Sequence, residues 1–181
     1  MACEILPDSA EPLFSREATW QSWLEVESAL ALTQAELGMI PQQAADEIAH
    51  CAKLEQLDVD ALAEDIERTM SPVMSLVRAL AERCDEDAGG YVHLGATTQN
   101  IILTGKMLQL QRAQRWLKGR LANQLALLAT MAEKGADWPC VARTNRRHAL
   151  PITFGYKVAG WIEELERNVQ RLELVEERAF V

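Results

Sequence analysis

The chain has 181 residues, which is enough for one ordinary domain or for one domain and part of another. Its hydrophobic content of 49%, with 9 glycines and 6 prolines, is typical of a globular protein and excludes a disordered or fibrous one. The net charge of −9 excludes a general attraction for nucleic acid or anionic membranes, because both require clustered positive charge. A local basic pocket for small anions remains compatible with this charge.

The cysteines and the hydropathy indicate the compartment. Cys3, Cys51, Cys84 and Cys140 are widely separated, and no pair has metal-ligand or redox-motif spacing. We therefore expect free thiols and no metal site. No signal peptide and no apolar run long enough to span a bilayer is present, so the sequence predicts a cytoplasmic protein without a membrane partner.

The first predicted element is an amphipathic helix from Arg16 to Leu37, followed by Gly38 as a C-terminal stop. Its apolar side chains recur at helical spacing: Trp20, Trp23, Leu24, Leu30 and Leu37. His50 follows on a polar helical stretch and is predicted to lie on the surface.

Further helices are predicted before residue 85, and no segment between Met1 and Gly90 alternates like a strand. Pro41 suits the first turn of one helix, and the segment DVDALAEDIERTM begins with acidic residues that complement a helix dipole. Pro72 opens a helix that runs towards Cys84. The DEDAGG run at 85–90 breaks the pattern and predicts a loop.

Two much longer apolar patterns occupy the second half of the chain. The first steps by threes and fours over more than eight turns, through Leu103, Met107, Leu110, Gln114, Leu117, Leu121, Leu125, Leu128 and Ala132. The second runs through Phe154, Val158, Trp161, Leu165, Val169, Leu172 and Val175, and it still continues at Val181. Helices of this length indicate a bundle or coiled coil. The missing stop signal predicts a fragment of a longer protein.

The long helix begins at the motif YVHLGATTQN, which has more polar side chains than a helix start requires. One interpretation is that Thr97 or Thr98 caps the helix by accepting a backbone N–H bond, while Gly95 relaxes the approach. The other is an anion site, because a helix N-terminus offers unpaired N–H donors and threonine hydroxyls add hydrogen bonds to a carboxylate.

A basic cluster lies in the segment that joins the two long helices. It contains Arg143, Arg146, Arg147 and His148 in an otherwise acidic chain. Guanidinium groups pair with carboxylates in a bidentate manner, so the cluster favours an anion site. A solvated basic loop is the alternative.

Both motifs, YVHLGATTQN and the later ARTNRRHALPITFGYKVAGW, resemble the fumarase/aspartase/adenylosuccinate lyase superfamily. The resemblance is greatest to its 3-carboxy-cis,cis-muconate cycloisomerase branch, which FSREATWQSWLEVESALA and SPVMSLVRAL also fit. It covers nearly the whole chain, and the two main motifs have the order and spacing of the family.

The resemblance implies an all-α fold, with a small N-terminal helical domain at 1–96 and the start of a long central helix bundle at 97–181. It implies a homotetramer whose active sites combine stretches from three subunits. One of these, a mobile loop with the pattern GSSxMPxKxNP, lies beyond the C-terminus of this chain. We therefore expect the chain alone to be inactive.

The resemblance also assigns roles to residues. Those that match substrate-binding positions are His93, Thr97, Thr98, Gln99, Arg143, Thr144 and Arg147. His148 matches a catalytic histidine of the cycloisomerase branch. The implied substrate is a di- or tricarboxylate, and the implied reaction couples proton transfer to making or breaking a C–O or C–N bond without a cofactor.

Departures from the family pattern leave alternatives open. Asn145 stands where many members have histidine, and Arg147 replaces a glutamine. Adenylosuccinate lyases usually have HD at positions 71–72 and TSTD in place of TTQN, so the pair at 71–72 and Gln99 disfavour an adenylosuccinate lyase. Asn100, in turn, departs from the aspartate that is usual in the cycloisomerase branch. An adenylosuccinate lyase and a non-catalytic oligomerising or ligand-binding module remain the alternatives.

Overall fold

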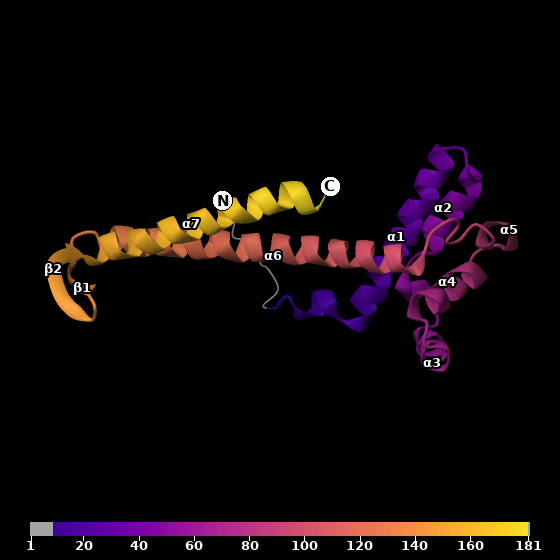
Figure 1. Ribbon diagram of the computed structural model, residues 1–181, viewed down its shortest axis with the longest axis horizontal. Coiled ribbons are helices and arrows are strands. Elements are labelled where there is room, and N and C mark those ends of the chain that lie inside the picture. Colours follow the sequence, from indigo (N-terminus) through magenta and orange to yellow (C-terminus); the bar gives the residue numbers. More distant parts are fainter. Residues whose placement is uncertain (1–8, 181) are drawn as a thin grey trace. The chain divides into compact units, whose positions relative to one another are not determined.

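The computed structural model describes residues 9–180, apart from the side chain of residue 86. Helices dominate it, which confirms the predicted all-α class (Figure 1). Contacts divide it into two compact units, at 9–110 and at 111–180. The elements in chain order are η1 (Glu11–Phe14), α1 (Arg16–Glu36), α2 (Gln42–Cys51), η2 (Leu54–Gln56), α3 (Val59–Thr69), α4 (Pro72–Arg83), α5 (Glu86–Gly89), α6 (Thr98–Lys134), β1 (Pro139–Thr144), β2 (Arg147–Thr153) and α7 (Phe154–Ala179).

Helix α1 has a capping residue before its first turn and a glycine after its last turn. The hydroxyl of Ser15 accepts the Ala18 N–H group at 3.1 Å, which satisfies one of the free donors of the first turn. Beyond the last turn, Gly38 has φ of +71°, a conformation that glycine adopts without strain. Leu37 was predicted to belong to the apolar face, but it is 71% exposed because it is the C-cap residue, outside the helix.

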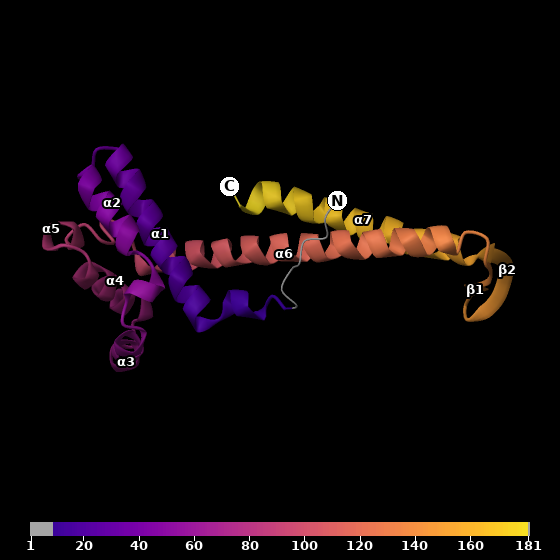
Figure 2. The same ribbon diagram turned by 180° about the vertical axis from the view of Figure 1, so that it is seen from behind.

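The next three helices start where the sequence predicted. Pro41 precedes α2, the Asp58 carboxylate accepts the Ala61 N–H group at the start of α3, and Pro72 is the first residue of α4. Their apolar side chains form one core with those of α1. Figure 2 shows the four helices grouped together. The side chains of this core that are at most 2% exposed include Leu24, Ile48, Leu76, Leu80 and Ile101.

The loop predicted at 85–90 contains a one-turn helix instead, so that prediction is wrong. The carbonyl of Asp85 accepts the N–H groups of Ala88 and Gly89 at 3.0 and 2.8 Å, which closes the turn. Gly89 lies so close to α4 that an added Cβ would be 2.6 Å from the Ala81 carbonyl oxygen. Two successive glycines were a signal for close backbone approach as well as for a loop.

The first turns of α6 pack in the 9–110 unit. A Cβ on Gly105 would lie 2.6 Å from Cδ1 of Trp23 and 2.9 Å from Oγ of Ser22. The absence of a side chain at Gly105 thus permits this close helix contact. One turn later, the buried Gln109 donates to the Leu13 carbonyl and to the Thr19 hydroxyl, at 2.9 and 3.0 Å.

In the 111–180 unit, α7 returns alongside α6, as both ribbon views show (Figures 1 and 2). Gln114 donates to the Leu172 carbonyl at 2.7 Å, and Lys118 forms an ion pair with Glu176 at 2.8 Å. At the reversal, the Gly155 N–H group donates to the Gly135 carbonyl at 2.8 Å. Without side chains, these glycines let the end of α6 and the start of α7 touch.

The linking segment is an antiparallel hairpin of β1 and β2, a feature that the sequence analysis did not predict. Asn145 and Arg146 form its two-residue turn, with φ of 45° and 67°. Positive φ at both central residues is typical of the turns that join twisted strands, and asparagine tolerates this conformation better than most residues. The register shifts between Val141 and Arg143.

Large apolar side chains remain exposed on both long helices. On α6 they are Leu103, Met107, Leu110, Leu117, Leu127 and Met131. On α7 they are Tyr156, Trp161, Leu174 and Val175.

Candidate functional site

Thr97 contacts the first turn of α6 through both its backbone and its side chain. Its carbonyl accepts the N–H groups of Asn100 and Ile101 at 3.0 and 3.3 Å, which closes the first turn. Its hydroxyl donates to Oδ1 of Asn100 at 2.9 Å. Thr97 and Gln99 are exposed, whereas Thr98 is half-buried. The side chains of Thr97 and Gln99 therefore reach solvent.

His93 lies in the turn before α6 with φ of 62°, and Gly95 follows with φ of 69°. Nδ1 of His93 is 2.7 Å from Oε1 of Glu27 on α1. The amide of Gln34, also on α1, donates to the Leu94 carbonyl at 2.7 Å. Two buried polar side chains of α1 thus hold the turn that carries His93.

Glu27 and Gln34 were missed by the sequence analysis. They stand at core spacing with Trp20, Trp23 and Ala31, and a polar residue on an apolar helix face is the signal that could have found them. Their contacts in the folded chain are 66 and 60 residues away. Sequence spacing alone does not show such partners.

The Glu27 carboxylate is almost completely buried, with only 1% of its side chain exposed. Oε1 contacts His93, whereas Oε2 has no hydrogen-bond partner among residues 9–180. Burial raises the pKa of Glu27 above its ordinary value, and the hydrogen bond from His93 opposes this rise. The Glu27–His93 pair is thus the strongest electrostatic feature near the YVHLGATTQN motif.

The hairpin brings the second set of predicted residues together. Arg143 pairs with His148 across the strands, and Thr144 pairs with Arg147 beside the turn. Directly opposite residues have Cβ atoms about 5 Å apart, so each pair can touch one ligand group. All four side chains are exposed. The predicted basic residues are therefore exposed on the hairpin, with these two successive pairs on opposite faces and Arg146 in the turn.

A hollow of about 640 Å³ lies beside this surface, between the hairpin and α7. Arg143, Tyr156, Lys157 and Glu163 supply its polar lining, together with apolar side chains such as Ile152. The Lys157 ammonium group also lies 5.7 Å from the centre of the Trp161 ring. Two cations and an apolar wall are compatible with a small carboxylate that has a hydrocarbon part.

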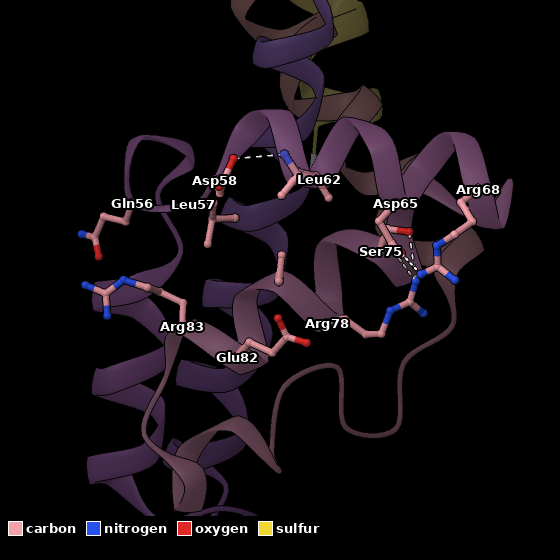
Figure 3. Close-up of a pocket in the computed structure, with 12 residues that line it drawn as sticks. Gln56, Leu57, Asp58, Leu62, Asp65, Arg68, Ser75, Arg78, Glu82 and Arg83 are labelled. Carbon is pink, nitrogen blue, oxygen red and sulfur yellow. Dashed lines mark hydrogen bonds and ion pairs between the residues drawn. The ribbon is translucent and has the colours of Figure 1, made fainter.

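A second cavity, of about 510 Å³, lies between α3 and α4 in the 9–110 unit (Figure 3). Asp65 forms ion pairs with Arg68 and Arg78 there, the latter at 2.5 Å, and Arg78 also donates to Ser75. The hydrogen bonds from Ser75 and Arg78 hold the pKa of Asp65 well below its usual range. Because Asp65 already forms ion pairs with both of these arginines, this cavity is a weaker candidate for an anion site than the hairpin surface.

Within residues 9–180, no three His, Cys, Asp or Glu side chains gather in a way that could hold a metal ion. In the same part of the chain, no helix is long and apolar enough to cross a membrane.

The predicted site residues therefore form two sets. His93, Thr97, Thr98 and Gln99 belong to the 9–110 unit, and the four hairpin residues belong to the 111–180 unit. Each set has the chemistry of a carboxylate-binding surface. That the two sets serve one ligand remains a prediction.

Comparison with known proteins identifies the family. The model of the Lyase family matches residues 8–181. The chain belongs to this lyase family. It is thus a member of the fumarase/aspartase/adenylosuccinate lyase superfamily, and the predicted resemblance is confirmed.

Three relatives illustrate this lyase family. The adenylosuccinate lyase of Methanothermobacter thermautotrophicus is 40% identical over 169 residues, which are 93% of this chain and 38% of that protein. The fumarate lyase from Mesorhizobium sp. BNC1 is 37% identical with a TM-score of 0.87, over 96% of this chain and 41% of that one. The 3-carboxy-cis,cis-muconate lactonizing enzyme from Pseudomonas putida is 35% identical with a TM-score of 0.85, over 96% and 40%.

The chain spans about two fifths of the length of these relatives. Adenylosuccinate lyases match it as well as the muconate enzymes do. Membership of the lyase family is therefore shown, and the reaction within the family is not.

Proposed function

We propose that this chain is the N-terminal part of a 3-carboxy-cis,cis-muconate cycloisomerase-like enzyme that acts on a di- or tricarboxylate. The reaction is proton transfer beside a carboxylate, coupled to making or breaking a C–O bond. The hairpin and the start of α6 are each proposed to contribute substrate-binding residues to the active sites of the assembled protein. We further propose that the central bundle domain starts at residue 97 and that 1–96 form the N-terminal domain.

The cross-strand pairing of Arg143 with His148 is the observation that supports this proposal most directly. A guanidinium group beside an imidazole can anchor a substrate carboxylate while the imidazole exchanges a proton with the adjacent carbon. Thr144 and Arg147 form the next pair and add two donors on the same hairpin. His93, Thr97, Thr98 and Gln99 are proposed to bind a second carboxylate at the helix N-terminus.

An adenylosuccinate lyase-type C–N lyase is the second candidate. The 40% identity to an adenylosuccinate lyase favours it. Adenylosuccinate lyases usually have other residues at the positions of Ser71, Pro72 and Gln99. These three residues therefore favour the cycloisomerase. Both reactions use the same carboxylate anchors, so the substrate distinguishes them.

A non-catalytic module is the remaining alternative, and Asn145 bears on it. This residue, which replaces the histidine of many members, is in the hairpin turn with φ of 45°. Because asparagine tolerates positive φ, the turn itself accounts for its presence. The replacement therefore does not by itself indicate a lost active site.

We also propose a homo-oligomer, a tetramer in the complete protein. The exposed apolar side chains of α6 and α7 support it, because a large apolar surface of this kind usually marks an interface. The partner that the site requires is a small carboxylate, with neither nucleic acid nor membrane involved.

The test is turnover by the protein expressed from the complete source gene, with 3-carboxymuconate, adenylosuccinate and fumarate as substrates. We expect turnover of 3-carboxymuconate there and none by the 181-residue chain alone. Turnover of adenylosuccinate only would favour the second candidate. Absence of turnover with all three would refute the enzyme and leave the module.

Two substitutions in the complete enzyme test the site residues. His148→Asn should lower kcat by about 10²–10⁴-fold with little change in binding, because it removes a proton-transfer group. Thr98→Val should weaken substrate binding about 10-fold or more, because a hydrogen bond to a charged group contributes about 1.5–3 kcal/mol. His50→Asn is the matched control, since His50 is exposed and outside both sets. Unchanged kinetics in both site variants would refute the assignment.

A further inference from the structure

Two polar side chains of α1 point into the core of the 9–110 unit and meet the segment before α6. Glu27 and Gln34 are seven residues apart, which is about two helical turns, so they lie on the same face. Glu27 contacts the His93 ring, and Gln34 contacts the backbone of the next residue, Leu94. Each has one side-chain oxygen that is buried without a partner in the described chain.

The contact with Glu27 determines which atom of His93 can reach a ligand. Nδ1 is engaged at 2.7 Å, whereas no hydrogen bond joins Nε2 to any residue of 9–180. The buried side-chain atoms of 9–180 that lack a hydrogen-bond partner do not include Nε2. The His93 side chain as a whole is 11% exposed. Nε2 is thus the ring nitrogen that has no hydrogen-bond partner among residues 9–180, and it is the one left to bind a ligand.

The environment of Glu27 also favours one proton count for the pair. If the pair holds two exchangeable protons, it is neutral overall, either as imidazolium with carboxylate or as imidazole with carboxylic acid. If it holds one, a neutral imidazole faces a carboxylate, and a net negative charge lies at a side chain that is 1% exposed. Uncompensated buried charge is strongly unfavourable, so the two-proton pair is the stable one.

Both arrangements of the two-proton pair have the same consequence for the ligand side. In the ion pair, each ring nitrogen has a proton. In the neutral arrangement, the carboxylic acid donates to Nδ1 and the ring proton is on Nε2. Nε2 is therefore an N–H donor in either case, whereas the one-proton pair would leave it with a lone pair that repels a carboxylate.

We propose that Glu27 is a positioning residue for His93: it binds Nδ1 and keeps Nε2 protonated and directed outward as a hydrogen-bond donor to a carboxylate ligand. Gln34 assists by fixing the backbone of the same turn, in which His93 has φ of 62°. The identity of the ligand rests on the proposed function. The state of the pair does not depend on it.

The test is ¹H–¹⁵N NMR of the imidazole rings in the intact 181-residue chain near pH 7. The chain has only three histidines, and His93→Asn identifies the signals of His93 by their loss. In the unsubstituted chain we expect a protonated Nε2 and a downfield proton in the hydrogen bond between Nδ1 and Glu27. A non-protonated Nε2 would overturn the proposal without the use of any variant.

Glu27→Gln should abolish the downfield proton signal, with the retained fold checked by circular dichroism. Glu36→Gln makes the same chemical change at an exposed position of α1 and should leave the signal unchanged. An unchanged His93 spectrum in Glu27→Gln would overturn the proposal. Since no ligand or turnover is involved, a negative result leaves the proposed function intact, and failure of the turnover assay leaves the pair intact.

Discussion

Replacement of Gly105 by alanine tests how closely α6 approaches α1. The new methyl group would lie 2.6 Å from Cδ1 of Trp23 and 2.9 Å from Oγ of Ser22, both far inside van der Waals contact. Trp23 is 8% exposed and Ser22 is fully buried, so neither side chain has free space to move into. Gly105→Ala should therefore strain the core between the two helices.

The expected magnitude combines two opposing effects. Overpacking of a filled core typically costs about 1–3 kcal/mol, whereas alanine in place of glycine stabilises a helix by up to about 1 kcal/mol. We expect Gly105→Ala to lower the free energy of unfolding by about 1–2 kcal/mol. Gly160 of α7 is the matched control, because nothing lies within 4 Å of an added Cβ there. Gly160→Ala should raise the free energy of unfolding by about 0.5–1 kcal/mol.

Urea denaturation followed by circular dichroism, at one protein concentration for all variants, measures both effects. Opposite signs for the two substitutions would support the close contact. Equal stabilisation by both would refute it, since the Gly105 site would then have room for a methyl group.

The remaining predictions concern charge, thiols and association. The lowered pKa of Asp65 means that its charged form stabilises the fold at pH values above the ordinary pKa of 3.8. This stabilisation is lost as the pH falls past 3.8 towards the lower pKa of the folded state, so Asp65→Asn should reduce the loss of stability between about pH 5 and pH 2 in acid titrations. Asp60→Asn, at an exposed site on α3, is the control, and an equal effect would contradict the assignment. Burial raises the pKa of Cys51 and raises that of Cys84 to about 12. Iodoacetamide at pH 8 should therefore label Cys140 before Cys51 and Cys84 in peptide mass spectrometry, and faster labelling of the buried pair would disprove this. Sedimentation of the 181-residue chain should show self-association, because burial of apolar surface contributes roughly 25 cal/mol per Å², and a monodisperse monomer would contradict it.

Local sequence determined where most helices begin. Ser15, Asp58 and Pro72 are signals that act within one turn of chain, and the structure has α1, α3 and α4 starting beside them. The length of α6 also follows from the sequence, because its apolar pattern repeats over many turns without a stop. The predicted helix of 97–132 agrees with the observed Thr98–Lys134 within two residues.

The hairpin shows where local reasoning was insufficient. The segment between the long helices contains glycine, prolines and charges, which favour a loop. Its strands form because β1 and β2 satisfy each other's backbone groups across a turn at Asn145 and Arg146. The β-branched residues Val141, Thr144, Ile152 and Thr153, around a residue that tolerates positive φ, were the available signal.

The candidate site divides in the same way. The residue types and spacing of YVHLGATTQN, and of the later basic motif, were sufficient to name His93 and His148 as residues of interest. Only the tertiary structure shows that Glu27 binds His93 and that Arg143 is the strand partner of His148. Sequence signals act through neighbouring residues, whereas the protonation of a buried pair depends on burial and on a partner 66 residues away, and these exist only once the chain has folded.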